Sequence, residues 1–304
     1  MDHRTNPPGA LAQVAPVRVE TALGPVEVAQ AGAGPAVLAL HGGMGGYDQG
    51  LILAETILPD ARAFRVIAPS RPGYLGTPGG GHDDPQAQAD LYAALLDRLG
   101  IARVVVAAVS AGGPSALAFA ARHPARCAGL VLVSACTVRL DVPQRVRRRL
   151  PAMRVLSRLP GVPAFLGWMT RRQPMKAARA SIADADLCAR TLAHPEAGPL
   201  MRMLQESIFR DIRRRLPGTQ NDVDRLSVLP EQAAGGIAAP VLVIHGTGDR
   251  VVPFHHATRL MEVLPCAELM AIDKGEHVAL FTHLDAIRAR VGGFLARLAV
   301  PASA

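Results

Sequence analysis

The sequence is poor in cysteine, lysine, aromatic residues and long hydrophobic runs. It has four cysteines in 304 residues, no Cys-x-x-C pair and no histidines at ligand spacing, so we expect buried thiols rather than a disulfide scaffold or a metal site. No run approaches the ~18 apolar residues of a bilayer-spanning helix, and the first ten residues lack the apolar core of a signal peptide. We therefore expect a cytoplasmic protein with no stable membrane association.

Lysine is so scarce that Lys176 and Lys274 are the only two among 33 basic residues, and arginine carries almost all of the net charge of +8. A GC-rich genome and an anionic partner are both consistent with this bias, because net charge bears on solubility and association rather than on fold. Aromatic residues make up 4% of the chain, so few side chains could stack on nucleic acid bases. No nucleic acid partner is therefore expected. Hydrophobic residues, at 49%, are enough for a large core.

Short apolar, β-branched runs alternate with longer amphipathic stretches. Runs without polar alternation suit strands buried on both faces, and alternation of strand and helix favours right-handed β-α-β units. We therefore predict an open, mostly parallel α/β sheet led by an antiparallel hairpin about Gly24 and Pro25. Strands are expected at 17–20, 26–28, 36–40, 64–68, 104–108, 130–133, 241–244 and 267–272, and helices at 86–99, 111–123, 255–264 and 280–298.

Residues 138–239 interrupt this alternation. They contain no convincing strand, carry three arginine clusters and are cut by several prolines, which indicates a set of short helices. An insertion between two core strands lies over the carboxyl ends of the sheet, where ligands bind in open α/β folds. We predict a helical cap at 138–239 on a core formed by 1–137 and 240–304.

Ser110 lies in the segment Ala108-Val109-Ser110-Ala111-Gly112, between a predicted strand and a predicted helix. A serine on such a sharp turn projects its hydroxyl into the cleft, and small residues two positions before and after it leave room for the turn. Ala108 stands where glycine is usual in this pattern. Ser110 is the candidate nucleophile, and a serine that caps the following helix is the alternative interpretation.

Glycines follow the third predicted strand in the segment HGGMGG at 41–46. Glycine lets the backbone approach a ligand and point N–H groups at it, and an oxyanion needs two such donors. Gly43 and Ala111 are the expected donors, with Met44 as a further candidate. The glycine spacing fits neither a Walker A loop nor a dinucleotide-binding loop, so phosphate or dinucleotide binding is not expected.

Asp249 and His277 lie on loops that follow the last two predicted strands. A carboxylate at such a position can orient an imidazole and stabilise its cation, although an Asp in a Gly-rich turn also bonds its own backbone. A histidine on a loop suits proton transfer from a hydroxyl. The two residues are therefore candidates for the orienting acid and the general base.

The four sites follow the order glycine loop, serine, aspartate, histidine, each after a different predicted strand. In this order, and in the motifs HGGMGG, VSAGG, GTGDRVVP and GEHVALF, the sequence resembles the α/β-hydrolase superfamily over residues 17–135 and 240–298. The stretch PSRPGYLGTP at 69–78 is similar to a loop of these proteins. The resemblance implies an eight-stranded sheet with helices on both faces, a triad of Ser110, His277 and Asp249, and acyl transfer without a metal or an organic cofactor.

The activity that the resemblance implies is hydrolysis of a carboxylic ester or related acyl bond of a small molecule, and we expect a monomer or homodimer. Alternatives on the same triad are a C–C bond hydrolase, an aminopeptidase and a perhydrolase; a non-catalytic ligand-binding member of the fold is another. Phe165 and Trp168 are candidate substrate contacts, with packing inside the cap as the alternative. The cap arginines form either a solvated face or an electropositive rim that attracts anionic substrates.

Overall fold

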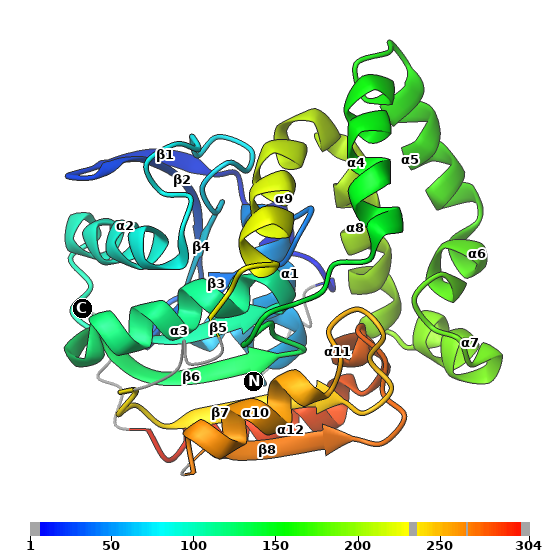
Figure 1. Ribbon diagram of the computed structural model, residues 1–304. Coiled ribbons are helices and arrows are strands. Elements are labelled where there is room, and N and C mark those ends of the chain that lie inside the picture. Colours follow the sequence, from blue (N-terminus) through cyan, green and yellow to red (C-terminus); the bar gives the residue numbers. More distant parts are fainter. Residues whose placement is uncertain (1–6, 231–235, 266, 299–304) are drawn as a thin grey trace.

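The computed structural model describes residues 7–230, 236–265 and 267–298. One sheet has the order β1-β2-β4-β3-β5-β6-β7-β8, in which β1/β2 and β2/β4 pair antiparallel and the other neighbours pair parallel (Figure 1). This confirms the predicted eight-stranded, mostly parallel sheet led by a hairpin. The strands are β1 (Val17–Thr21), β2 (Gly24–Ala31), β3 (Ala36–Leu40), β4 (Arg65–Pro69), β5 (Val104–Val109), β6 (Cys127–Val133), β7 (Val241–Gly246) and β8 (Glu268–Ile272).

The leading hairpin turns two residues earlier than the sequence indicated. Thr21 pairs with Gly24, so the turn residues are Ala22 and Leu23, and Gly24 and Pro25 lie inside β2. A proline is tolerated there because it lies near the start of its strand, where the missing N–H costs little ladder bonding.

Each face of the sheet has its own hydrophobic core, because successive side chains of a strand point to opposite faces. Along β5, Val105 and Ala107 pack on the side of α1 and α12, whereas Val106 and Ala108 pack on the side of α2, α3 and α10. Burial on both faces accounts for the continuous apolar runs. The core helices are α1 (Tyr47–Ile57), α2 (Pro85–Arg98), α3 (Gly113–Arg122), α10 (His255–Val263), α11 (Ala279–Thr282) and α12 (Leu284–Leu295).

Helix α1 was not among the expected helices. It follows glycines, lacks a side-chain N-cap and contains Gly50, and all residues from Asp48 to Ile57 are buried. A helix covered on all sides shows no amphipathic period, so its sequence carries little signal. The last expected helix, 280–298, is divided at His283, whose backbone is not helical, into α11 and α12.

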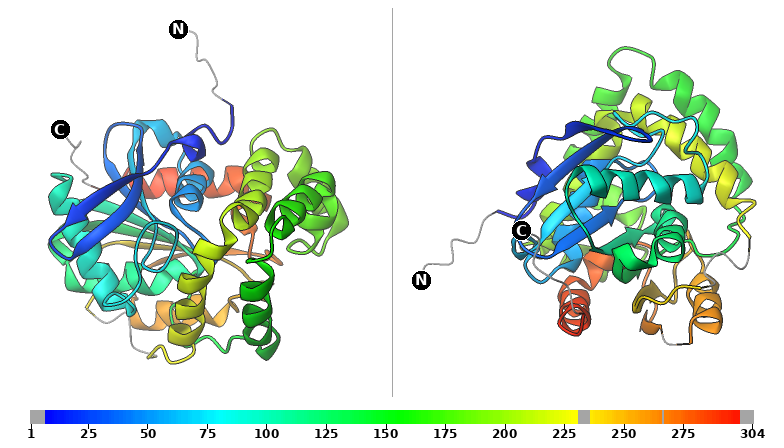
Figure 2. Two further views of the ribbon diagram at one scale, coloured as in Figure 1. Left: turned by 90° about the horizontal axis from the view of Figure 1, so that it is seen from above. Right: turned by 90° about the vertical axis from the view of Figure 1, so that its left-hand side faces the viewer.

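Six helices and no strand occupy the described part of the insertion between β6 and β7. Figures 1 and 2 show them gathered at one end of the sheet, beyond the carboxyl ends of the parallel strands. Helix α8 packs on α1, and α5 packs on α8. The division into core and cap domains at 137/138 and 239/240 stays a prediction. The helices are α4 (Gln144–Leu156), α5 (Val162–Arg172), α6 (Pro174–Arg179), α7 (Ala185–Ala193), α8 (Ala197–Arg210) and α9 (Ile212–Leu226).

Three of the four cysteines lie in the described residues. Cys127, Cys136 and Cys188 are buried free thiols, as expected, and Cys266 lies outside the described residues. Burial raises the pKa of Cys127 to about 12, which keeps this thiol protonated and unreactive. Across the described residues, no helix is both long and apolar enough to cross a bilayer.

Candidate active site

Ser110 lies on a strained turn between β5 and α3. Its φ of 53° is in the left-handed region, which residues other than glycine adopt uncommonly and which recurs at active sites. The turn leaves no space beside it: a Cβ on Gly112 would lie 2.7 Å from the carbonyl oxygen of His41. Ala108 is fully buried in the core, so a methyl group fits at the position where glycine is usual in the pattern.

The structure brings Ser110, His277 and Asp249 together from three different loops. His277 Nε2 lies 3.1 Å from Ser110 Oγ, and His277 Nδ1 lies 2.8 Å from Asp249 Oδ2. Both distances are within hydrogen-bond range. A serine next to a base that is itself oriented by a carboxylate is the arrangement of an activated nucleophile.

The Asp249 carboxylate is held in its ionised form. Burial by itself would raise the pKa of Asp249, but the bond from His277 and the backbone N–H groups of Val251 and Val252, both donating to Oδ1, outweigh burial and lower the pKa. His245 lies 3.6 Å from the same carboxylate, and burial lowers the pKa of this histidine. His277 therefore faces a carboxylate that stays charged in neutral solution.

The candidate oxyanion donors differ in their availability. Gly43 lines the same cavity as Ser110, and Ala111 lies in the first turn of a helical segment, where N–H groups have no acceptor within the helix. Among the described residues, no atom accepts a hydrogen bond from the N–H of Gly43 or Ala111. The N–H of Met44 instead donates to Thr219 Oγ1 at 3.2 Å. The structure therefore favours Gly43 and Ala111 over Met44.

Ser110 opens into a cavity of about 150 Å³. Two core helices, α1 and α11, and the insertion helix α8 contribute its walls. The described residues that line it include no aspartate, glutamate, lysine or arginine. The lining residues are Gly42, Gly43, Gln49, Ile52, Leu53, Val109, Ser110, Leu204, Ile208, His277, Val278, Leu280 and Phe281.

The model of the alpha/beta hydrolase fold family matches residues 35–284. The chain belongs to the α/β-hydrolase fold family. A solved α/β hydrolase fold protein from Nakamurella multipartita is 32% identical, with a TM-score of 0.79 over 92% of this chain and 99% of that one.

Curated relatives of this α/β-hydrolase fold protein are hydrolases. The uncharacterized hydrolase YcgS of Bacillus subtilis (strain 168) is 28% identical over 271 residues, which are 86% of this chain and 92% of the relative. The 2-hydroxy-6-oxo-6-phenylhexa-2,4-dienoate hydrolase of Burkholderia cepacia is 25% identical, over 89% of this chain and 91% of the relative. The family and these relatives support a hydrolase.

In this α/β hydrolase, buried Arg71 holds the glycine loop that follows β3. Its Nε donates to the carbonyl oxygen of His41 at 2.9 Å, and its two terminal nitrogens donate to the carboxylate of Asp222 at 2.9 and 2.5 Å. The backbone N–H of Arg71 donates to His41 Nε2, so the ring proton is on Nδ1, which donates to the carbonyl oxygen of Gly42. Burial, reinforced by Arg71, lowers the pKa of His41 well below 6.5. A neutral histidine and a paired arginine thus position the residues next to Gly43.

Two buried ion pairs connect helix α9 of the insertion to the α/β-hydrolase core. Asp222 binds Arg71, and Arg215 binds Asp48 with a closest distance of 2.6 Å. None of these four side chains is more than 10% exposed. No sequence motif pointed to a role for these four residues, although Arg71 lies in the PSRPGYLGTP stretch. The sequence could not indicate that Arg71 and Asp222 form a pair, because they lie about 150 residues apart in the chain.

Phe165 and Trp168 do not line the Ser110 cavity of this α/β hydrolase. They lie on α5 with 56% and 47% of their surface exposed, and their rings stack with centroids 5.9 Å apart. The structure does not bring these candidate substrate contacts to the triad. The cavity wall from the insertion comes instead from Leu204 and Ile208 of α8.

Proposed function

We propose that this protein is a serine hydrolase that cleaves a carboxylic ester, or a related acyl bond, of a small molecule through an acyl-enzyme on Ser110. One observation carries the proposal: His277 bridges Ser110 Oγ and Asp249 at the wall of an uncharged cavity. No metal or organic cofactor takes part in the proposed reaction.

In the proposed reaction, Ser110 Oγ attacks the carbonyl carbon while His277 Nε2 takes its proton. Gly43 and Ala111 donate their N–H groups to the tetrahedral oxyanion, each donor worth about 3 kcal/mol. His277 returns the proton to the leaving oxygen as the C–O bond breaks, which leaves the acyl-enzyme. A water molecule then attacks this ester with His277 as base, and the carboxylic acid departs as Ser110 regains its proton.

The cavity supports a short, apolar acyl group. A volume of about 150 Å³ accommodates a group about as large as benzene, and its walls are mostly aliphatic side chains. The polar side chain of Gln49 is already bonded, since its Nε2 donates to the carbonyl oxygen of Met44 and to Ser207 Oγ. Longer acyl chains would extend beyond this volume.

A C–C bond hydrolase is the second candidate, because curated relatives are named as hydrolases of 2-hydroxy-6-oxo dienoates. Such a substrate carries a carboxylate, and a buried carboxylate requires a cation or several donors. The described lining offers no arginine or lysine, which favours the ester. The same lining offers no carboxylate for the amine of an aminopeptidase substrate.

The test combines fluorophosphonate labelling with a series of p-nitrophenyl esters from acetate to decanoate. We expect the wild-type protein to be labelled and to prefer short acyl chains, and we expect Ser110→Ala to lose labelling and roughly 10⁶-fold in kcat while its melting temperature is retained. Absence of labelling in the folded wild type would favour a non-catalytic binding protein. Faster turnover of a 2-hydroxy-6-oxo dienoate than of every ester would establish the second candidate.

A further inference from the structure

Residues 142–183 contain ten basic residues and no acidic residue. This segment covers α4, α5 and α6, which form the outer side of the insertion in Figure 1. All nine of these basic side chains whose exposure the structure describes are exposed. Because the charge of residues 142–183 exceeds the net charge of the whole chain, the positive potential of the molecule is concentrated on this segment. The basic residues are Arg145, Arg147, Arg148, Arg149, Arg154, Arg158, Arg171, Arg172, Lys176 and Arg179.

The same helices expose large apolar side chains. Helix α5 packs on α8 with one side, and its other side carries the stacked pair of Phe165 and Trp168. The guanidinium of Arg172 lies over the Trp168 ring at 5.4 Å. We call this surface of α4, α5 and α6 the basic cap face. Its exposed apolar residues are Val146, Val155, Leu156, Leu159, Phe165, Trp168 and Met175.

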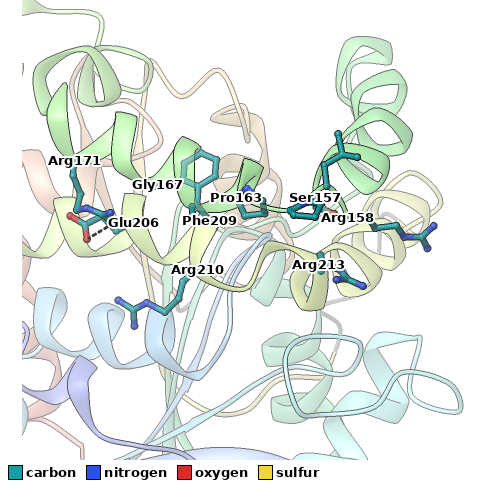
Figure 3. A pocket seen from close by; sticks show the side chains of 13 residues that line it. Ser157, Arg158, Pro163, Gly167, Arg171, Glu206, Phe209, Arg210 and Arg213 are labelled. Atoms are coloured by element: carbon teal, nitrogen blue, oxygen red, sulfur yellow. Dashed lines mark ion pairs between the residues drawn. The ribbon is translucent and has the colours of Figure 1, made fainter.

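A groove of about 610 Å³ borders this face between α5 and α8. Figure 3 shows Arg171 paired with Glu206 at one end, whereas Arg158 and Arg213 lie at the other end. Among the described residues, no carboxylate lies within ion-pair distance of Arg158, Arg210 or Arg213. The guanidinium groups are spread around the groove and do not converge on one point, which suits several separated phosphates better than one small anion.

We propose that the basic cap face docks reversibly on an anionic phospholipid surface. Helices that combine arginines with exposed Trp, Phe and Leu bind at the membrane interface, with the rings among the headgroups and the cations on lipid phosphates. Each basic residue near such a surface contributes attraction that salt screens. Docking of this kind is salt-dependent and reversible, unlike a stable membrane anchor.

Two other occupants of the basic cap face fit less well. A nucleic acid would pair with the arginines but offers no apolar phase for Val155, Leu156 and Leu159. A second copy of the chain would bring one strongly positive face against another, because no acidic residue lies between 142 and 183. The lipid surface is the one occupant that satisfies both the charges and the apolar side chains.

The only tryptophan of the chain, Trp168, reports directly on this face. We expect its fluorescence emission to shift to the blue when vesicles containing phosphatidylglycerol are added to the full chain, and to be quenched by brominated acyl chains. Vesicles of pure phosphatidylcholine should cause no shift, and 0.5 M NaCl should reverse the effect. An unchanged emission with phosphatidylglycerol, or an equal shift with pure phosphatidylcholine, would overturn the proposal.

Charge variants test whether vesicle binding depends on the basic cap face or on the positive charge of the whole protein. Arg154→Gln/Arg158→Gln removes two exposed charges of the face, and Arg18→Gln/Arg98→Gln removes two exposed charges of the core. We expect partitioning to phosphatidylglycerol vesicles to weaken about 25-fold in the first variant, at about five-fold for each charge, and to change little in the second. Equal weakening in both variants would overturn the proposal. So would tighter binding of duplex DNA than of vesicles, or a blue shift that depends on protein concentration alone.

Discussion

At the scale of single residues, the backbone N–H of Gly43 has a proposed role that no side chain can take over. We predict that Gly43→Pro, which removes this donor, lowers kcat about 10²- to 10³-fold with an active ester, because the oxyanion then keeps only the donor of Ala111. The residue before the new proline is Gly42, which tolerates the conformations that a following proline allows. Steady-state kinetics would measure the loss.

Gly43→Ala is the matched control for this variant. A Cβ at Gly43 would have no heavy atom within 4 Å, so alanine fits and keeps the N–H. We expect this variant to retain most of the activity, with thermal melting used to verify that both variants are folded. Equal kcat values for the proline and alanine variants would exclude Gly43 as an oxyanion donor.

At the scale of elements, α9 is joined to the glycine loop through Asp222 and Arg71. We predict that Asp222→Asn lowers the free energy of unfolding by about 3 kcal/mol, because the Arg71 charge stays buried without a carboxylate. We also expect kcat to fall more than tenfold, since Arg71 holds the carbonyl oxygens of His41 and Gly42 next to Gly43. Denaturant unfolding and ester kinetics would measure the two effects separately.

Asp48→Asn provides the comparison, since it breaks the other buried pair between α9 and the core. A similar loss of stability is expected, with a smaller effect on kcat, because Arg215 makes no bond to the carbonyl groups of the glycine loop in the described structure. If both variants lose kcat equally, anchoring of α9 in general would matter, and Arg71 would have no particular role in positioning the loop.

At the scale of the whole molecule, buried neutral histidines make stability depend on pH. Burial lowers the pKa of His41, His245 and His256, for His256 to about 4 against an ordinary value of 6.5. Repulsion from His255 and His245 lowers the pKa of His256 further, whereas the nearby Asp249 carboxylate raises it. The unfolded chain therefore binds protons that the folded chain excludes. We predict that stability is full above about pH 6.5 and declines towards pH 4, with about 3 kcal/mol from His256.

His256→Asn tests this dependence on pH. His256 Nδ1 accepts hydrogen bonds from the N–H groups of Thr137 and Val138, and an asparagine oxygen occupies a similar position without titrating. Urea unfolding between pH 4 and 7 should show a shallower decline in this variant, whereas His255→Asn at the exposed neighbouring position should keep most of it. A wild-type free energy of unfolding that is constant over this range would contradict the prediction.

The accuracy of the sequence-based predictions depended on whether the signal was local. Parallel strands buried on both faces leave continuous apolar runs, so their positions were predicted to within a few residues. Helix α1 was missed because burial on all sides removes the amphipathic period. The exposure of Phe165 and Trp168 was also not predictable, because it depends on which side of α5 packs against α8.

The sequence by itself determined the order of the strands and loops along the chain. It also determined the types of residue that meet at the carboxyl edge of the sheet, because parallel strands carry their carboxyl ends to one edge. Together with the resemblance of the motifs to the α/β-hydrolase superfamily, this predicted that Ser110, Asp249 and His277 would lie together. Only the tertiary structure decided what surrounds them: the uncharged cavity, the pairing of Arg71 with Asp222 and the bond between Met44 and Thr219. These contacts join residues that are distant in the chain, and packing across the insertion and the core selects them.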